Sequence, residues 1–396
     1  MLRYWKLIVI TAIIVFSFGT YYVQNALAKS EYPEFVFKTI NGDEAEIESL
    51  MVTGEYGVNE EGLSEHFNLT SEGTVYREER SYLDQLFYRS TLIERLQSDY
   101  RSFMRGKGES STTLFENNEL LAFVGPYSLD EPDDSFDVEL LDKRTKERTA
   151  FQVTLPNAKE YSFINIQDVQ VSHDKLIVIS RNIKRGSPSE SDSEEIHVYQ
   201  IDLTNQKINS DEVILTSDSG SPAEWIHISE INSHSHIGQE NYFVFQLGYM
   251  KGEQYGSSVR DRTEYVAYHY ETNETIELDL SEEVGADPTF SKVYKDSIYF
   301  FDTEANNLQI KAYNIRNDEW ILIELQTTEE VHPANLVEIK NDMLYMANFN
   351  DKQTNIYALN LEMEELVYEG KIEFANPKDE QGDYYLNLYD MVIENE

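Results

Sequence analysis

The chain has 396 residues and a formal charge of −41, from 73 acidic and 32 basic side chains. The negative electrostatic field of such a chain repels phosphate backbones, which disfavours nucleic acid as a partner. The same field attracts cations and basic proteins. The absence of cysteine excludes disulfides, thiolate metal sites and cysteine nucleophiles, and a hydrophobic fraction of 40% argues against overall disorder.

The chain opens with a segment directed to a membrane, residues 1–28. Arg3 and Lys6 precede an uncharged stretch over 7–23. Basic residues that flank a membrane segment stay in the cytoplasm, so the bulk of the chain, which follows the stretch, is expected outside the cytoplasm. The stretch is long enough for a retained single-pass anchor in the cell membrane, while the small residues at 26–28 fit a signal-peptidase site. Both outcomes stay open: a tethered protein, or a secreted one cut after Ala28.

Residues 29–112 are predicted to form a strand-rich segment with one helix. Short β-prone runs separated by turn residues lie at 35–37, 46–52, 66–69 and 74–76. Apolar residues recur at helical spacing over 80–105, as at Ile93, Leu96 and Phe103, which predicts a helix there. This helix is rich in arginine, so it either packs against the acidic β-region or serves as a partner-binding arm.

A strand pattern recurs from residue 113 almost to the end of the chain. Five β-prone runs predict second strands of a repeated unit, at 120–123, 176–179, 242–245, 298–301 and 344–347. Five more predict third strands, at 138–141, 197–201, 265–268, 310–313 and 356–359. Such strand pairs cannot bury both faces alone, so neighbouring units must stack.

This repeat predicts a mostly β fold, with a β-propeller of about six to seven antiparallel blades over 113–396. The strands at 35–76 and the run at 384–393 are expected to complete a blade together, because pairing the two ends of the chain removes exposed sheet edges. A pair of β-sandwiches is the alternative architecture. In its repeat shape over 113–370 the chain resembles membrane-tethered, propeller-like extracytoplasmic proteins of Gram-positive bacteria, a resemblance that implies no catalytic residue.

The mouths of the first strands are the expected place for a ligand in a propeller. Trp225, His227 and Tyr294 are the ligand-channel candidates by this argument.

A second candidate site is a metal site at His234 and His236. These residues are two apart, so on a strand their imidazoles share a face, and His227 or Glu230 could supply a third ligand. The same stretch also fits a pH-responsive histidine patch or an ordinary polar turn. The sequence has no phosphate loop or dinucleotide fingerprint and predicts no cofactor.

These features favour a non-enzymatic, extracytoplasmic binding or scaffold module whose partner is a basic protein or a cell-wall component. The alternative is a propeller-type hydrolase acting on cell-wall or extracellular carbohydrate. That activity needs two carboxylates facing each other across a cleft, and the sequence alone does not single out a pair among so many acids.

Overall fold

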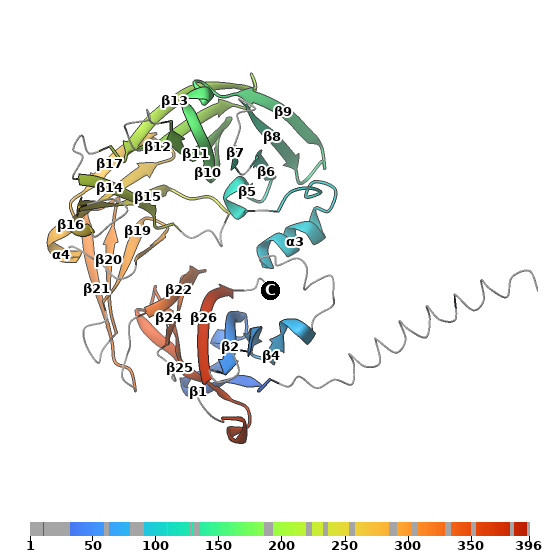
Figure 1. Ribbon diagram of the computed structural model, residues 1–396, viewed down its shortest axis with the longest axis vertical. Helices are drawn as coiled ribbons and strands as arrows, with labels where there is room; N and C mark the ends of the chain where they lie inside the picture. The colour runs from blue at the N-terminus through green and yellow to red at the C-terminus, as the bar shows by residue number, and fades with distance from the viewer. Residues whose placement is uncertain are drawn as a thin grey trace, which may run out of the picture. The chain divides into compact units, whose positions relative to one another are not determined.

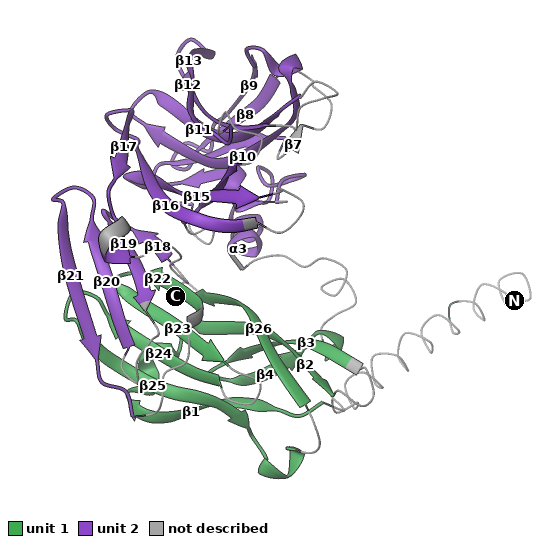
Figure 2. Ribbon diagram, turned by 60° about the vertical axis from the view of Figure 1, so that its left-hand side comes forward, with its two compact units in different colours: residues 1–88, 334–396 green, residues 89–333 purple. Residues whose placement is uncertain are grey.

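The computed structural model describes residues 11, 32–58, 63–79, 91–108, 110–126, 128–129, 135–185, 193–218, 224–232, 237–252, 258–284, 291–302, 308–328, 334–349, 354–380 and 384–393 (Figure 1). Within these residues the chain forms six antiparallel sheets of four or five strands, here named A to F. The chain divides into two compact units, with residues 1–88 and 334–396 in unit 1 and residues 89–333 in unit 2 (Figure 2).

Unit 1 holds sheets A and B. Sheet A has the order β1-β25-β24-β23-β22, with β1 at Phe35–Gly42, β22 at Ala334–Lys340, β23 at Met343–Phe349, β24 at Thr354–Asn360 and β25 at Glu365–Phe374. Sheet B has the order β26-β2-β3-β4, with β2 at Leu50–Val58, β3 at Leu63–Thr70, β4 at Gly73–Tyr76 and β26 at Tyr384–Ile393. Buried apolar side chains of both sheets, among them Phe67, Leu69 and Ile356, form one core cluster.

Segments from both ends of the described chain are paired in unit 1. The late strand β26 pairs with β2, placing Leu50 opposite Ile393, and the early strand β1 pairs with β25, placing Phe35 opposite Phe374 (Figure 1). The predicted pairing of 384–393 with the early strands is therefore confirmed. The strand at 35–37 differs in that it joins the last repeat, sheet A, instead of its sequence neighbours.

Unit 2 holds the four remaining sheets. Sheet C contains β5 (Leu114–Glu116), β6 (Leu120–Gly125), β8 (Ser135–Asp142) and β9 (Arg148–Thr154). Sheet D contains β7 (Ser128–Leu129), β10 (Tyr161–Ser172), β11 (Lys175–Lys184), β12 (Ser193–Asp202) and β13 (Lys207–Thr216). Sheet E contains β14 (Glu224–Glu230), β15 (Tyr242–Gly252), β16 (Ser258–His269) and β17 (Glu274–Leu278). Sheet F contains β18 (Ser291–Tyr294), β19 (Ser297–Asp302), β20 (Leu308–Asn314) and β21 (Glu319–Leu325).

The sheets of unit 2 pack face to face in chain order. Both faces of β11 are buried: Leu176 and Val178 lie in the core shared by sheets C and D, and Ile177 and Ile179 in the core shared by D and E. A third cluster joins sheets E and F. Because central strands are covered on both sides, their sequences are continuous apolar runs. The four antiparallel strands that recur in each sheet also follow the strand order of a propeller blade.

The predicted second and third strands of all five repeats are confirmed as β6, β11, β15, β19 and β23, and as β8, β12, β16, β20 and β24. Asn341 and Asp342 both have positive φ, as a two-residue hairpin turn requires, and they connect β22 to β23. The β-sandwich alternative is wrong, because the described residues form six sheets instead of two stacked pairs. The predicted strand at 46–52 is wrong at its start, where Glu44–Ile47 is a 3-10 helix (η1) capped by Asp43.

Short helices connect or cover the sheets. They are η2 (Arg77–Glu79), α3 (Thr91–Asp99), η3 (Ser111–Thr113), η4 (Ala158–Glu160), α4 (Ser281–Val284) and η5 (Pro377–Asp379). Of the predicted helix over 80–105, the structure has α3, followed by turns to 106, and residues 80–90 lie outside the described residues.

Helix α3 is part of the core of unit 2. Ile93 and Leu96 are buried with Leu114 and Leu121 of sheet C in one cluster. Arg95 contacts Glu116 of β5 at 2.5 Å, and Lys143 contacts the same carboxylate at 2.7 Å. The described part of the predicted helix therefore packs against sheet C, as one of the two sequence-based alternatives expected.

Replacing Glu116 by Gln is expected to lower the free energy of unfolding by about 1 to 2 kcal/mol at pH 7, because two charge-assisted contacts are lost. Burial alone raises the pKa of Glu116, but hydrogen bonds from Arg95 and Lys143 outweigh it and hold the pKa below its ordinary value. This stabilisation is present above the unfolded-state pKa and is lost as the pH falls through the lower folded-state pKa. Urea unfolding of both proteins should converge at acid pH, while Glu119→Gln at a nearby exposed turn position should match wild type at every pH.

Within the described residues, no helix is long and apolar enough to span a membrane. The apolar stretch over 7–23 lies outside them, apart from residue 11.

Candidate functional site

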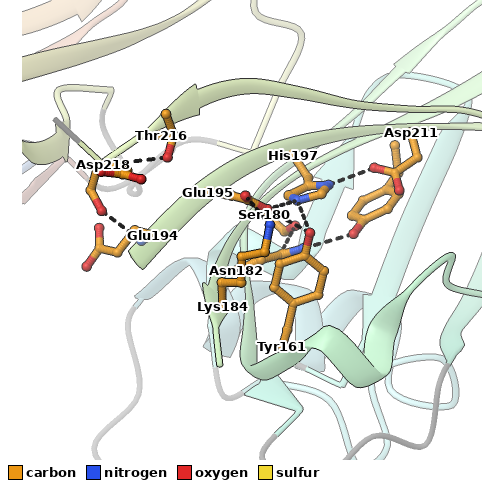
Figure 3. A network of polar contacts seen from close by, with 12 residues as sticks. Tyr161, Ser180, Asn182, Lys184, Glu194, Glu195, His197, Asp211, Thr216 and Asp218 are labelled. Atoms are coloured by element: carbon orange, nitrogen blue, oxygen red, sulfur yellow. Dashed lines mark hydrogen bonds and ion pairs between the residues drawn. The ribbon is translucent and has the colours of Figure 1, made fainter. Parts of the chain in front are cut away.

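A buried polar network lies in sheet D, on the face that packs against sheet C (Figure 3). Its centre is His197 of β12, which is 3% exposed. Nδ1 of His197 lies 2.7 Å from Asp211 of β13, and Nε2 lies 2.9 Å from the hydroxyl of Tyr161 and 3.4 Å from Glu195. The Tyr161 hydroxyl donates to Glu195 at 2.7 Å, and Lys184 donates to the same carboxylate at 3.0 Å.

The network continues along β11 towards the apolar core. Ser180 donates to Asn182 at 2.7 Å, and Asn182 donates to the hydroxyl of Tyr199 at 3.0 Å. The Tyr199 ring stacks on His197 with 5.5 Å between centroids. Alternation along the strand explains the placement: Leu176 and Val178 precede Ser180 and Asn182 on one face of β11, so that face changes from apolar to polar along its length.

An Asp–His pair is also the arrangement that orients a general base in hydrolases, so its surroundings decide its role. Here the other side of the imidazole is closed by Tyr161 and Glu195, and both Tyr161 and His197 are buried. Burial, reinforced by the hydrogen bond to Glu195, raises the pKa of the Tyr161 hydroxyl, which keeps it a neutral donor. Among the described residues, the arrangement fixes strand positions in the core and leaves the imidazole of His197 almost fully enclosed.

Two concave sites lie elsewhere in unit 2, beside the turns that connect first to second strands and third to fourth strands. The first cavity has a volume of about 250 Å³ and is lined by Val171, Ser172, His173, Gln239, Glu240, Asn241, Tyr270 and Glu271. The second cavity has a volume of about 600 Å³ and is lined by Asn241, Tyr242, His269, Glu271, Thr272, Glu274, Ile276, Asp296 and Arg316. The two cavities share Asn241 and Glu271, and no residue of the His197 network lines either of them.

The second cavity combines carboxylates with an aromatic wall. Glu271, Glu274 and Asp296 contribute three carboxylates. The one guanidinium in the described lining is that of Arg316, which lies 3.8 Å from the Asp296 carboxylate. The rings of Tyr242 and His269 are 4.7 Å apart. Burial and the charge of Asp296 raise the pKa of the Tyr242 hydroxyl, so this ring is a neutral wall in a site whose net charge is negative.

Two of the three predicted ligand-channel residues lie together. Trp225 and His227 are on β14 of sheet E, with ring centroids 6.1 Å apart, and His227 is exposed. Tyr294 is at the end of β18 in sheet F, where the backbone of the preceding Val293 contacts Ile231, beyond the opposite end of β14. At ~3.3 Å per residue, six residues of strand separate Ile231 from Trp225 by roughly 20 Å, so Tyr294 is not brought to the other two. A ligand-binding role for these residues stays a prediction.

The predicted metal residues, His234 and His236, lie outside the described residues. Among the residues that the structure does describe, no group of three or more His, Asp or Glu side chains is arranged to hold a metal ion. The metal site therefore also stays a prediction.

Sequence reasoning did not find the cavities, because their lining comes from turns of three sheets. Sheet D supplies His173, sheet E supplies Asn241 and Glu271, and sheet F supplies Asp296. Of these positions, Glu271 follows a predicted third strand and Asp296 precedes a predicted second strand. That recurrence of polar turn residues on one side of neighbouring repeats is the signal by which the cavities could have been found.

No protein-family model and no curated protein matches the chain. Similar solved structures include an acylaminoacyl peptidase of Pyrococcus horikoshii (12% identity, 83% of this chain and 45% of that chain, TM-score 0.35) and a polysaccharide lyase (7%, 67% and 58%, 0.38). A third is the β-propeller domain of the Trilobed protease from Pyrococcus furiosus (10%, 84% and 82%, 0.32). This chain spans less than two thirds of the peptidase and lyase chains, and at these TM-scores none of the similarities assigns an activity to it.

Proposed function

We propose that this protein is a non-enzymatic binding module that works outside the cytoplasmic membrane and takes a basic protein as its partner. The supporting observation is the second cavity, where Glu271, Glu274 and Asp296 face a concave space beside the Tyr242 and His269 rings. A lysine or arginine side chain suits such a site, because carboxylates neutralise its charge and an aromatic face attracts the cation. The charge of −41 steers such partners towards the protein from a distance.

The proposal extends to architecture and location. The six sheets would serve as the blades of a β-propeller, which agrees with their shared meander and with the pairing of early and late strands in unit 1. The segment 1–28 would hold the protein at the outer face of the cell membrane or be removed on secretion. Mass spectrometry of the native protein distinguishes these cases: a first residue of Lys29 means secretion, and retention of 1–28 means a tether.

Neutralising two carboxylates of the second cavity is expected to weaken binding of a basic peptide about tenfold. The variant is Glu271→Gln with Glu274→Gln, and the expected loss corresponds to two contacts of about 0.5 to 1 kcal/mol each at an exposed site. Calorimetric titration with a lysine- and arginine-rich peptide at low and high salt measures the change.

Glu277→Gln is the matched control, because Glu277 lies on β17 with Glu274, is exposed and does not line the cavity. It should change the affinity less than twofold. Equal weakening by Glu277→Gln would mean that only the general surface charge attracts the peptide, and the cavity would lose its role.

The second candidate is the carbohydrate hydrolase, which one observation favours: two glutamates line the same cavity, as a pair of catalytic carboxylates must. Incubating the protein with cell-wall polysaccharide and measuring new reducing ends tests it. Release by the wild type that is abolished in Glu271→Gln would replace the binding proposal with the enzymatic one.

A further inference from the structure

The 237–241 segment is the part of the β14–β15 connection that leads into β15, and it contacts sheets C, D and F of unit 2. Its first residue, Ile237, is buried in the cluster of α3 and sheet C, and its carbonyl accepts from the backbone N–H of Glu116 at 2.7 Å. Its last residue, Asn241, donates to Asp296 of sheet F at 2.7 Å. Asn241 lines both cavities and Glu240 lines the first, so the position of this segment defines the shape of both.

Gln170 of β10 holds the middle of the segment. Its side chain is 1% exposed, and its amide nitrogen donates to the carbonyl of Gly238 at 3.2 Å. Its amide oxygen accepts from the backbone N–H of Glu240 at 3.1 Å. One side chain thus satisfies two backbone groups of the segment, and its orientation must be fixed for both bonds to form.

Asp168 fixes that orientation. It lies two residues before Gln170 on β10, and its Oδ2 accepts from the Gln170 amide at 3.1 Å and from the hydroxyl of Tyr270. Tyr270 is 2% exposed and follows β16, where it also lines the first cavity. An ionised carboxylate only accepts hydrogen bonds, which matches these two donors, whereas a protonated carboxyl must itself find an acceptor.

The charges around Asp168 favour proton uptake. The titratable groups near Asp168 come from three elements. They are Tyr270 at the end of β16, Glu240 in the 237–241 segment, and His173 of the β10–β11 turn, which lines the first cavity. Glu116 of β5 is occupied by Arg95 and Lys143, and the residue opposite Asp168 on β11 is the apolar Ile179. Burial, with a further contribution from the Glu240 charge, raises the pKa of Asp168 to about 6 against the opposing hydrogen bonds from Tyr270 and Gln170.

We propose that Asp168 is a proton switch for the binding site: its ionised form fixes Gln170 and the 237–241 segment, and protonation releases them and weakens binding in mild acid. This inference names the regulation of the binding site and rests on the proposed function. Protonation removes the negative charge that strengthens the hydrogen bonds from Tyr270 and Gln170, and it adds an O–H that needs an acceptor of its own, so both contacts weaken. The wall formed by Glu240 and Asn241 then loses its support.

The test compares wild type with Asp168→Asn, whose side chain resembles the protonated acid in carrying both a donor and an acceptor. Binding of a peptide made of lysine, arginine and glycine, which does not itself titrate in this range, is measured at pH 7.5 and pH 5.0. The wild-type affinity is expected to fall about five- to tenfold, while Asp168→Asn should be weak and equal at both values. His173 and His269 remain in the variant, so a fall that persists in Asp168→Asn would assign the effect to histidine and overturn the inference.

A second measurement does not depend on a ligand. Hydrogen exchange of the Glu240 amide, corrected for intrinsic rates, should lose protection between pH 7.5 and pH 5.0 in wild type and be low at both in Asp168→Asn. If this protection changes but no peptide binds at either pH, the proposed function fails and the switch stands. If peptide binds but the protection is constant in wild type, the switch fails and the proposed function stands.

Discussion

Ending the chain after Glu380, which removes β26, is expected to unfold unit 1. Leu388, Met391 and Ile393 of β26 are buried between its sheets, and the strand supplies a full set of partners to β2. Losing three buried apolar side chains costs roughly 5 to 8 kcal/mol, which is comparable with the entire stability of a typical domain. The edge of β2 would also be left unpaired. Hydrogen exchange should show β2 and β3 unprotected while the strands of unit 2 keep their protection.

Single substitutions on β26 calibrate this result. Leu388→Ala should lower the free energy of unfolding by about 2 to 4 kcal/mol, because it opens a cavity beside Phe67 and Gly54. Asn387→Ala, at an exposed position on the same strand, should change it by less than about 0.5 kcal/mol. A truncated protein whose β2 stayed protected would show that β26 is an accessory strand.

Replacing His197 by Ala is expected to lower the free energy of unfolding by about 3 kcal/mol. The substitution removes the group that lies between Asp211, Tyr161 and Glu195, and it leaves buried polar atoms without partners. It also removes the ring that stacks on Tyr199. Urea unfolding at pH 7 measures the loss.

His227→Ala is the control, because His227 is exposed on β14 and should give a change below about 0.5 kcal/mol. A His197→Ala protein as stable as wild type would contradict a structural role for the network.

The strands of the repeats were predictable because a strand that is buried on both faces consists of consecutive apolar residues, which are visible in the sequence as short apolar runs. The runs at 176–179 and 356–359 are such cases, and each lies in a central strand. The 3-10 helix at Glu44–Ile47 was missed because its capping residue, Asp43, outweighs the alternation that resembles a strand. The pairing of β1 with β25 of sheet A was missed because pairing between segments more than 300 residues apart leaves no local signal in the sequence.

The candidate site was less predictable than the fold. Trp225 and His227 are neighbours on β14 because residues two apart share a strand face, a rule that sequence alone can apply. The contact of Gln170 with Gly238 and Glu240 depends on how sheets D and E stack, and the register of β12 against β13, with its two irregularities, decides that Asp211 reaches His197. Distances across sheets are set by tertiary packing, which no pattern within one strand encodes.

The two-segment composition of unit 1 has a consequence for biosynthesis. Unit 2 is one continuous stretch, so its strands can pair without any segment from the end of the chain, whereas β1 must wait for β25 and one edge of β2 must wait for β26. A nascent chain that ends before residue 384 would contain a complete unit 2 and a unit 1 that lacks β26. The unpaired edge of β2 in such a product is expected to favour aggregation and proteolysis until β26 is added.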